Sequence, residues 1–553
     1  MTAPIHEHDL TPGTPSADAS IRGAADPVDG AGHDRSAWRE PAVMGAFALL
    51  VGAMAAAMYA THRAGHWWGD DWALYLRQAR SLLDGDAARI TADNEFTVQH
   101  SLGQPFSPPL YPWGFPLLLV PFVAVVGLDV DALTIVPVLC ACAFACAWFA
   151  MARRRIGTVA AFVATAAVTL TPLLVSWSEL IQSEWPFLAA VFVVLAAVDR
   201  TIASRVLTDT AARWWPLIAL GVGVAAAFSI RREGLALVVA VGGAQLALLT
   251  TGSPPFRRMF RDLRLVTRLL VPHLSALLTV QILQWTLPST LVPKYDGTSI
   301  TNIWHFAPRL ARNLAEVSGI KRPWDRSPVV LGSVPLGWAT FYAYIALAVV
   351  GVVLAVGVNR RRDLHLVLYA VTAYAIGGSF RSAINRYVAS VGPVLFLLGL
   401  VAIVSLTSLG GRRLAIGGKV VVTVVSLAFV AGNVANLHLR AESAAQAADV
   451  GAVEWGAQHP AAIELWEYVK SATDPTDIVA GPKARALTLM TDRRSIQVDQ
   501  WRPLPDDWSP TLVVTEVGSP TDSSMRTRTS RYTVAWANDR FVVYRALTEP
   551  QHP

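Results

Sequence analysis

The stretch YPWGFPLLLVPFVAVVGLD, residues 111–129, decides how this 553-residue chain is arranged. It is apolar enough to enter a membrane, yet a transmembrane helix needs about 20 consecutive apolar residues to cross the hydrocarbon layer. The stretch also contains Pro112, Pro116 and Pro121, and proline removes backbone hydrogen bonds inside a helix. Whether residues 112–128 cross the membrane sets the side on which every later loop lies.

The rest of the chain supplies many longer apolar runs. Its composition is 53% hydrophobic and 16% charged, whereas soluble globular domains have about 25% charged residues. A single soluble core has no room for so many helices that are apolar on every side. We therefore predict a mainly α, polytopic transmembrane helical bundle. Its eleven expected spans are about 42–61, 131–151, 157–175, 185–199, 215–230, 234–251, 269–287, 337–358, 364–380, 388–408 and 415–433.

Lysine and arginine decide between the two topologies, because short cytoplasmic loops are enriched in these residues. If 112–128 does not cross, the basic loops and the N-terminus all lie on one side; if it crosses, these loops move outside. We therefore predict that 112–128 is a re-entrant or interfacial segment, which is tolerated only against protein or a cavity. The basic loops contain Arg153–Arg155, Arg200, Arg205, Arg213, Arg257, Arg258, Arg261, Arg264, Arg268, Arg360–Arg362, Arg412, Arg413 and Lys419.

Two regions flank the predicted transmembrane domain, residues 41–435. Residues 1–40 lack apolar periodicity and are rich in Ala, Pro, Gly, Asp and His, which predicts a disordered cytoplasmic tail. Residues 440–553 predict a small soluble α/β domain outside the cytoplasm. They combine an amphipathic helix at 461–472 with alternating strands at 477–481, 511–517, 532–537 and 541–547.

Asp70 and Asp71 stand at the start of an amphipathic helix in the first outer loop. Its apolar stripe runs from Trp72 to Leu83, Gly85 ends it, and we expect Arg77, Arg80 and Asp84 on the polar face. The helix is expected to lie flat at the membrane surface. Trp67 and Trp68 add aromatic surface that suits a sugar or a lipid headgroup. The alternative is structural, with Asp70 capping the helix and Asp71 complementing its dipole.

Further acids and arginines fall at the same outer boundary. Glu184 precedes a span, Arg232 and Glu233 lie between two spans with almost no loop, and Arg386 and Tyr387 begin another. An arginine here can bind a phosphate, with Glu233 orienting Arg232. The alternatives are snorkelling of each arginine to lipid headgroups and a helix-start role for Glu184. Cys140, Cys142 and Cys146 share one apolar run, so we expect neither a disulfide nor a metal site.

This set of groups suits transfer from a lipid-phosphate donor. The donor phosphate is anionic and needs cations, whereas an acceptor hydroxyl is a weak nucleophile and needs a base such as a carboxylate. A phosphate leaving group needs no proton when it departs, so neutralisation by arginine suffices. Two other functions stay open: a transporter or flippase of lipid-linked sugars, and a cell-surface polysaccharide polymerase or ligase.

The sequence resembles the GT-C superfamily of polytopic membrane glycosyltransferases. Within it, the chain is similar to the bacterial branch related to protein O-mannosyltransferases and lipid A aminoarabinose transferases. The segment 465–496 looks like the outer soluble domain that many members carry. The motifs that carry the resemblance are GDDWALYLRQARSLLDG (69–85), FSPPLYPWGFPLL (106–118), SEWPFL (183–188), RREG (231–234) and NRYVASVGPVLF (385–396).

The resemblance implies an inverting single displacement with a polyprenyl-phosphate-linked sugar as donor. Asp70 matches the family base, and Asp71 stands where many members have Glu. Trp72-Ala73 after this pair departs from the family pattern, so either Asp70 or Asp71 can be the base. Glu184 matches a second-loop acid that positions substrates. Arg232 and Arg386 match positions near the donor phosphate. Further substrate contacts are expected from Tyr387, Trp68, Tyr75, Tyr111 and Glu233.

The expected protein is therefore a multi-pass glycosyltransferase of the bacterial cytoplasmic membrane, with its site and C-terminal domain outside. The acceptor would be a glycan, a lipid or a protein, and no nucleic acid is expected as a partner. No cofactor is expected either, because this branch does not require a metal ion.

Overall fold

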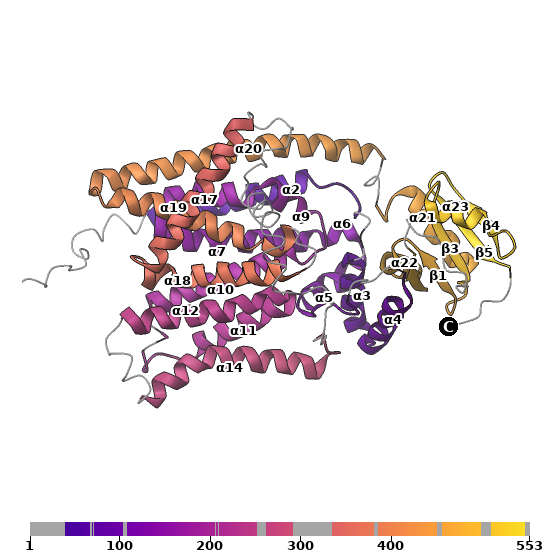
Figure 1. Cartoon of the computed structure of the whole chain (residues 1–553), viewed down its shortest axis with the longest axis horizontal. Helices are drawn as coiled ribbons and strands as arrows, with labels where there is room; N and C mark the ends of the chain where they lie inside the picture. The colour runs from indigo at the N-terminus through magenta and orange to yellow at the C-terminus, as the bar shows by residue number, and fades with distance from the viewer. Residues whose placement is uncertain are drawn as a thin grey trace, which may run out of the picture. The chain divides into compact units, whose positions relative to one another are not determined.

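A computed structural model of the chain describes residues 39–66, 69, 71–102, 108–204, 206–207, 209–251, 262–290, 334–380, 385–450, 456–498 and 510–547 (Figure 1). By internal contacts the chain divides into residues 1–49 and residues 50–553. The candidate site and the C-terminal module both lie in the second unit. The predicted disordered tail falls almost wholly outside the described residues.

Seven described helices are long and apolar enough to cross a membrane, or eight if the bent pair α8 and α9 forms one span. Three shorter apolar helices, α5, α11 and α17, accompany them, and α18 completes the set. The helices are α2 (Arg39–Ala60), α5 (Gly114–Val126), α7 (Ile135–Ile156), α8 (Thr158–Thr169), α9 (Pro172–Ser178), α10 (Glu184–Ala203), α11 (Trp215–Ile230), α12 (Ala236–Thr251), α14 (Leu263–Thr286), α17 (Val334–Val356), α18 (Arg360–Ser379), α19 (Val391–Ser408) and α20 (Arg412–Val450).

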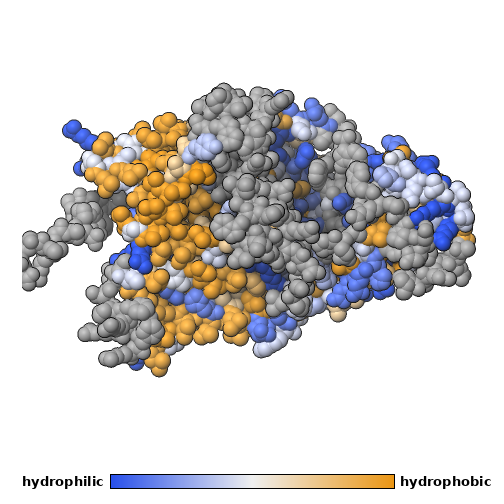
Figure 2. All heavy atoms as spheres, in the orientation of Figure 1, coloured by the Kyte–Doolittle hydropathy of each residue, from blue (hydrophilic) through white to orange (hydrophobic). Residues whose placement is uncertain are grey.

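The mainly helical, multi-pass architecture is confirmed. Each of the eleven predicted spans coincides with one helix or with the bent pair, whereas the number of crossings stays a prediction. Figure 2 shows hydrophobic residues gathered over these helices. Large apolar side chains remain exposed there, including Leu277 at 64% and Trp285 at 74% on α14, as expected for surfaces that face lipid tails.

Residues 112–128, which decided the topology, form the 13-residue helix α5 (Gly114–Val126). At about 1.5 Å per residue such a helix is about 20 Å long, well short of the ~30 Å hydrocarbon layer. It packs on α3 and α11, so it lies against protein as a non-spanning segment must. Its sidedness stays a prediction.

Close helix packing builds the interior of the membrane-spanning part. Phe144 of α7 meets Trp185 and Phe192 of α10 edge-to-face, with ring centroids 5.6 and 4.8 Å apart. A glycine permits the tightest crossing, between α11 and α14. A Cβ atom on Gly221 would lie 1.9 Å from the Ser275 hydroxyl and 2.2 Å from the Pro272 carbonyl oxygen.

Two helices of the first outer loop carry the proposed site. They are α3 (Asp71–Asp84), which Gly85 ends with φ +73°, and α4 (Ala87–His100). The expectation that Arg77 lies on an exposed polar face is wrong, because the residue is only 7% exposed. The physical reason is that α4 and α22 of the C-terminal module pack on α3 and cover this face.

The C-terminal module contains a five-stranded mixed sheet of order β2-β1-β3-β5-β4. The pairs β1–β2 and β1–β3 are parallel, and β3–β5 and β4–β5 are antiparallel. This confirms the small α/β domain. Its elements are α21 (Pro460–Ala472), β1 (Ile478–Gly481), α22 (Ala484–Thr491), β2 (Arg494–Gln497), β3 (Leu512–Glu516), α23 (Pro520–Arg526), β4 (Tyr532–Ala537) and β5 (Phe541–Ala546). Before it, α20 continues past residue 435 to Val450.

Candidate active site

Asp71, the first residue of α3, lies at the centre of a cluster of polar side chains. The Tyr111 hydroxyl donates a hydrogen bond to Asp71 Oδ1 at 2.5 Å, and Arg386 Nη1 donates to Oδ2 at 3.0 Å. The Asp71 side chain keeps 29% of its surface exposed. The carboxylate is therefore both held in place and reachable from outside.

The surroundings of Asp71 favour its ionised form. Burial raises the pKa of this carboxyl, but the charge of Arg386, hydrogen bonds from Tyr111 and Arg386, and the charge of Arg485 together lower it below its ordinary value. Asp71 is therefore an ionised carboxylate at neutral pH, which is the form that accepts a proton.

Arg386 joins Asp71 to a second acid from a distant part of the chain. It lies in the short 3-10 helix η2 (Asn385–Val388) that precedes α19. Its Nε donates to Glu184 Oε1, while its Nη1 bonds Asp71. The Arg386 side chain is 23% exposed, whereas Glu184, the first residue of α10, is fully buried. One guanidinium therefore bridges two carboxylates. The Asp71 carboxylate is partly exposed, whereas the Glu184 carboxylate is buried.

Only one of the two carboxylate oxygens of Glu184 has hydrogen-bond partners among the described residues. Its Oε1 also accepts from Arg231 Nη1 at 2.9 Å, but its buried Oε2 has no hydrogen-bond partner among the described residues. A buried acceptor without a partner is costly and calls for an explanation. This oxygen belongs to the carboxylate whose other oxygen, Oε1, binds Arg231 and Arg386.

Arg231 forms the inner wall of the cluster. It ends α11, and its guanidinium donates from Nη2 to Glu233 Oε1 at 2.8 Å. Its Cζ lies 5.5 Å from the centre of the Tyr387 ring and 5.8 Å from that of Phe187. Two carboxylates and two aromatic faces therefore fix this buried cation.

Tyr75 and Tyr111 provide the aromatic side of the site. Their ring centroids are 4.8 Å apart, and the Tyr75 hydroxyl bonds the Ser183 hydroxyl at 3.2 Å. Burial and the nearby charge of Asp71 raise the pKa of both phenols above the ordinary value. Both tyrosines are therefore neutral hydrogen-bond donors throughout the physiological pH range.

The C-terminal module also contributes a residue to this site. Arg485 of α22 is fully buried, and its Nη1 donates to the Tyr111 hydroxyl at 3.3 Å. Its Nε donates to Asn94 Oδ1 at 3.1 Å and its Nη2 to the Pro108 carbonyl at 2.6 Å. Arg485 therefore fixes the tyrosine that bonds Asp71.

The structure brings together seven of the ten predicted site residues. Two others, Asp70 and Trp68, lie outside the described residues. Arg232 contacts Thr290 instead, and its Nη2 donates to the Thr290 carbonyl at 2.8 Å and hydroxyl at 2.6 Å. Tyr387 contacts Arg231 and stacks on Phe380, with ring centroids 4.6 Å apart. The gathered residues are Asp71, Glu184, Arg386, Tyr75, Tyr111, Glu233 and Tyr387.

Two residues of the site were not among the predicted site residues: Arg231, whose neighbour Arg232 was chosen instead, and Arg485. Arg231 is adjacent to Arg232 in the sequence. Arg231 has an extended backbone, with φ −147° and ψ 141°, whereas Arg232 begins a 3-10 helix, and the two side chains have different partners. Arg485 reaches the site because α22 packs on α3. No local sequence pattern predicts this contact. The described residues contain no group of three or more His, Cys, Asp or Glu side chains that would hold a metal ion.

Comparisons with known proteins bear on the fold. No family model and no curated protein matches the sequence. ArnT from Cupriavidus metallidurans bound to undecaprenyl phosphate shares its fold with a TM-score of 0.52 and 14% identity, covering 92% of this chain and 99% of ArnT. The apo form of the same protein gives a TM-score of 0.53 and 14% identity, over 91% and 98% of the two chains.

An oligosaccharyltransferase from Archaeoglobus fulgidus, tethered to an acceptor peptide, is more distant, with a TM-score of 0.47 and 11% identity over 82% of this chain and 63% of that one. The chain therefore shares the fold of ArnT over nearly the full length of both chains, as expected for a mainly helical membrane protein with a small C-terminal sheet domain.

Proposed function

We propose that this chain is a glycosyltransferase that moves a sugar from a polyprenyl-phosphate-linked donor to an acceptor hydroxyl. The observation that carries this proposal is the bridge from Asp71 through Arg386 to Glu184, in a chain that shares the fold of ArnT. The ArnT structure of the same fold was determined with undecaprenyl phosphate, which supports a lipid-phosphate donor.

Asp71 is the proposed base, because the cluster holds it ionised and exposed. The acceptor oxygen attacks the anomeric carbon of the donor as its proton passes to Asp71. The bond from this carbon to the phosphate oxygen breaks, and polyprenyl phosphate leaves with the electron pair. This single displacement inverts the anomeric centre. Arg386 and Arg231 are the proposed cations for the departing phosphate.

Arg386 is suited to this role because its present partners are exchangeable. It is 23% exposed and binds two carboxylates, so an incoming phosphate can replace one contact without unfolding the cluster. Glu184 and Arg231 are more deeply buried and position Arg386 from the inside. Arg232 remains a candidate for the donor phosphate through its predicted match to the family position.

The direct test is sugar transfer by the full chain in membranes. Polyprenyl-phosphate donors with hexoses and pentoses would be supplied, and released polyprenyl phosphate measured. We expect Asp71→Asn to lower turnover by at least 100-fold at normal expression, whereas Asp70→Asn keeps most activity. Wild-type turnover in Asp71→Asn would contradict the assignment of the base.

The two arginine candidates can be separated in the same assay. We expect Arg386→Gln to lower turnover strongly and to weaken undecaprenyl phosphate binding, followed by native mass spectrometry. Arg232→Gln tests the family match, because a phosphate role predicts a raised KM for the donor. An unchanged KM would leave Arg232 with a structural role, through its contacts with Thr290 and the Phe228 ring.

We also propose that the site and the C-terminal module face the outside of the bacterial cytoplasmic membrane. The support is the distribution of Lys and Arg, which places the basic loops and the N-terminus on the opposite side. Alkaline phosphatase fused after residue 553 should be active in intact bacteria. An active reporter in the loop with Arg153–Arg155 would reverse the topology.

A further inference from the structure

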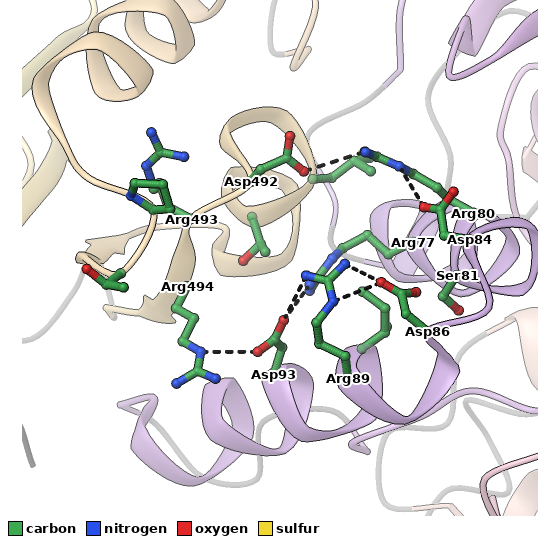
Figure 3. Close-up of a pocket in the computed structure, with 15 residues that line it drawn as sticks. Arg77, Arg80, Ser81, Asp84, Asp86, Arg89, Asp93, Asp492, Arg493 and Arg494 are labelled. Atoms are coloured by element: carbon green, nitrogen blue, oxygen red, sulfur yellow. Dashed lines mark hydrogen bonds and ion pairs between the residues drawn. The ribbon is translucent and has the colours of Figure 1, made fainter.

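A second pocket lies between the outer helices α3 and α4 and the C-terminal module (Figure 3). None of Asp71, Glu184 and Arg386 lines it. Its volume is about 360 Å³, which falls within the usual range for small-molecule sites of about 300–1,000 Å³. Arginines and aspartates dominate the lining. They are Arg77, Arg80, Arg89, Arg493, Arg494, Asp84, Asp86, Asp93 and Asp492.

Three guanidinium groups converge on the carboxylate of Asp93, as Figure 3 shows. Arg494 Nε lies 3.1 Å from Asp93 Oδ1, while Arg77 Nη2 and Arg89 Nη1 lie 3.6 and 4.0 Å from Oδ2. Arg89 has Asp86 as a second partner. Arg77 and Arg494 therefore share a single carboxylate, and this end of the pocket carries an excess of positive charge.

Arg77 is the least satisfied of these cations. The residue is 7% exposed, and its Nη1 has no hydrogen-bond partner among the described residues. Burial lowers the pKa of Arg77 to about 10, so the side chain is still a cation at neutral pH. A buried guanidinium with one weak ion pair is costly, and an anionic ligand in the pocket would offset that cost.

We propose that this pocket binds a saccharide through an anionic group, a phosphate or a carboxylate. The guanidinium groups match the geometry of such anions, and the rim carboxylates of Asp84 and Asp492 accept hydrogen bonds from sugar hydroxyls. The pocket shares α3 with Asp71, and Arg77 lies about 9 Å further along the helix axis. Under the proposed function, the bound saccharide is the acceptor.

Binding can be tested without transfer. The full chain in detergent would be titrated with mannose 6-phosphate, glucuronate, mannose and inorganic phosphate, followed by isothermal calorimetry. We expect both acidic sugars to bind at least 10-fold more tightly than mannose, and mannose 6-phosphate more tightly than inorganic phosphate. Equal affinities for mannose 6-phosphate and inorganic phosphate would overturn the saccharide part.

Variants locate the site. The double variant Arg80→Gln/Arg494→Gln should weaken binding of the acidic sugars at least 10-fold, since both side chains are about half exposed and their loss should not unfold the module. Asp492→Asn keeps a side-chain oxygen that accepts from a sugar hydroxyl but removes a negative charge from the rim, so it should strengthen binding 2- to 5-fold. Its φ of 54° is one that Asn tolerates. The matched control is Arg526→Gln, an exposed arginine of the same module outside the pocket, which should change nothing.

Two results would overturn the proposal: no binding of either acidic sugar at 10 mM, or an equal loss in the Arg526→Gln control. Transfer assays separate this outcome from failure of the proposed function. A chain that transfers sugar but binds no acidic saccharide refutes the pocket alone. A chain that binds acidic saccharides through Arg80 and Arg494 but transfers no sugar refutes the proposed function and leaves the binding site standing.

Discussion

At the scale of single residues, the charge of Arg386 and a hydrogen bond from Tyr111 both lower the pKa of Asp71. The Tyr111 hydroxyl donates to its Oδ1 at 2.5 Å and contributes to the lowered pKa. Tyr75 stands next to Tyr111, but its hydroxyl bonds Ser183 instead. The two tyrosines therefore form a natural test and control for the proposed base.

We expect Tyr111→Phe to move the acid limb of kcat/KM to higher pH. The sign follows from the lost hydrogen bond, because Asp71 without it is harder to ionise and its pKa rises. Tyr75→Phe keeps that bond and should leave the limb in place. The measurement is transfer from about pH 3 to pH 8, because the pKa of Asp71 lies below the ordinary value of about 3.9. An unchanged limb in Tyr111→Phe would contradict the role of Asp71 as base.

Glu184 and Glu179 form a second matched pair. Each is a buried acid that pairs with two arginines: Glu184 with Arg231 and Arg386, and Glu179 with Arg63 and Arg440. Replacing one partner of a buried ion pair typically costs about 3–5 kcal/mol of stability. Only Glu184, however, has an orphan oxygen beside the proposed reacting groups.

We therefore expect Glu184→Gln and Glu179→Gln to lower the melting temperature in detergent to a similar extent. Turnover per folded molecule should fall at least 10-fold in Glu184→Gln and change little in Glu179→Gln. Thermal unfolding combined with transfer assays measures both effects. Equal loss of turnover in the two variants would show that Glu184 acts only through stability.

At the scale of elements, sequence periodicity predicted the long helices and the longer strands well. Four strands were expected because they alternate over four to six residues, whereas β2 was missed, since RSIQ has no such alternation. The short, mostly buried helix α22, which lies between β1 and β2, was also missed. These two elements are the ones that pack on α3 and α4, so their absence explains the wrong exposure expected for Arg77.

The crossing of α11 and α14 makes a prediction at this scale. Gly221→Ala would place a Cβ atom 2.2 Å from the Pro272 carbonyl oxygen, so the two helices must separate. We expect a loss of about 1–3 kcal/mol, the usual cost of overpacking. Gly242→Ala in α12 is the control, because nothing lies within 4 Å of its added Cβ atom. The melting temperature in detergent should fall only for Gly221→Ala.

At the scale of the whole molecule, the site is assembled from segments hundreds of residues apart. Asp71, Glu184 and Arg386 were predicted from their position at one membrane boundary, which topology alone supplies. The sequence could not choose Arg231 over Arg232, because the choice depends on one backbone turn at the end of α11. Arg485 was beyond reach, since its contact with Tyr111 arises only when α22 docks on α3.

Docking of the C-terminal module can be tested through Arg485. We expect Arg485→Gln to lower turnover at least 10-fold and to move the acid limb to higher pH, since the charge of Arg485 helps to lower the pKa of Asp71. Arg526→Gln is the control, because Arg526 belongs to the same module, lies outside the second pocket and pairs with Asp522 instead. An Arg485→Gln chain with the wild-type pH profile would show that the module only caps the helices.

The burial of Arg485 beside Tyr111 also has a consequence for the order in which the chain is synthesised and folded. The ribosome makes residue 485 after all the described helices that could cross the membrane, so these helices can insert before Asp71 has its full set of neighbours. Under the proposed function, the chain should therefore stay inactive until residues 451–553 have been made and have folded against α3 and α4. Polypeptides stalled at residue 450 should accumulate in the membrane without transferring sugar, and supplying residues 451–553 as a separate secreted fragment should restore turnover.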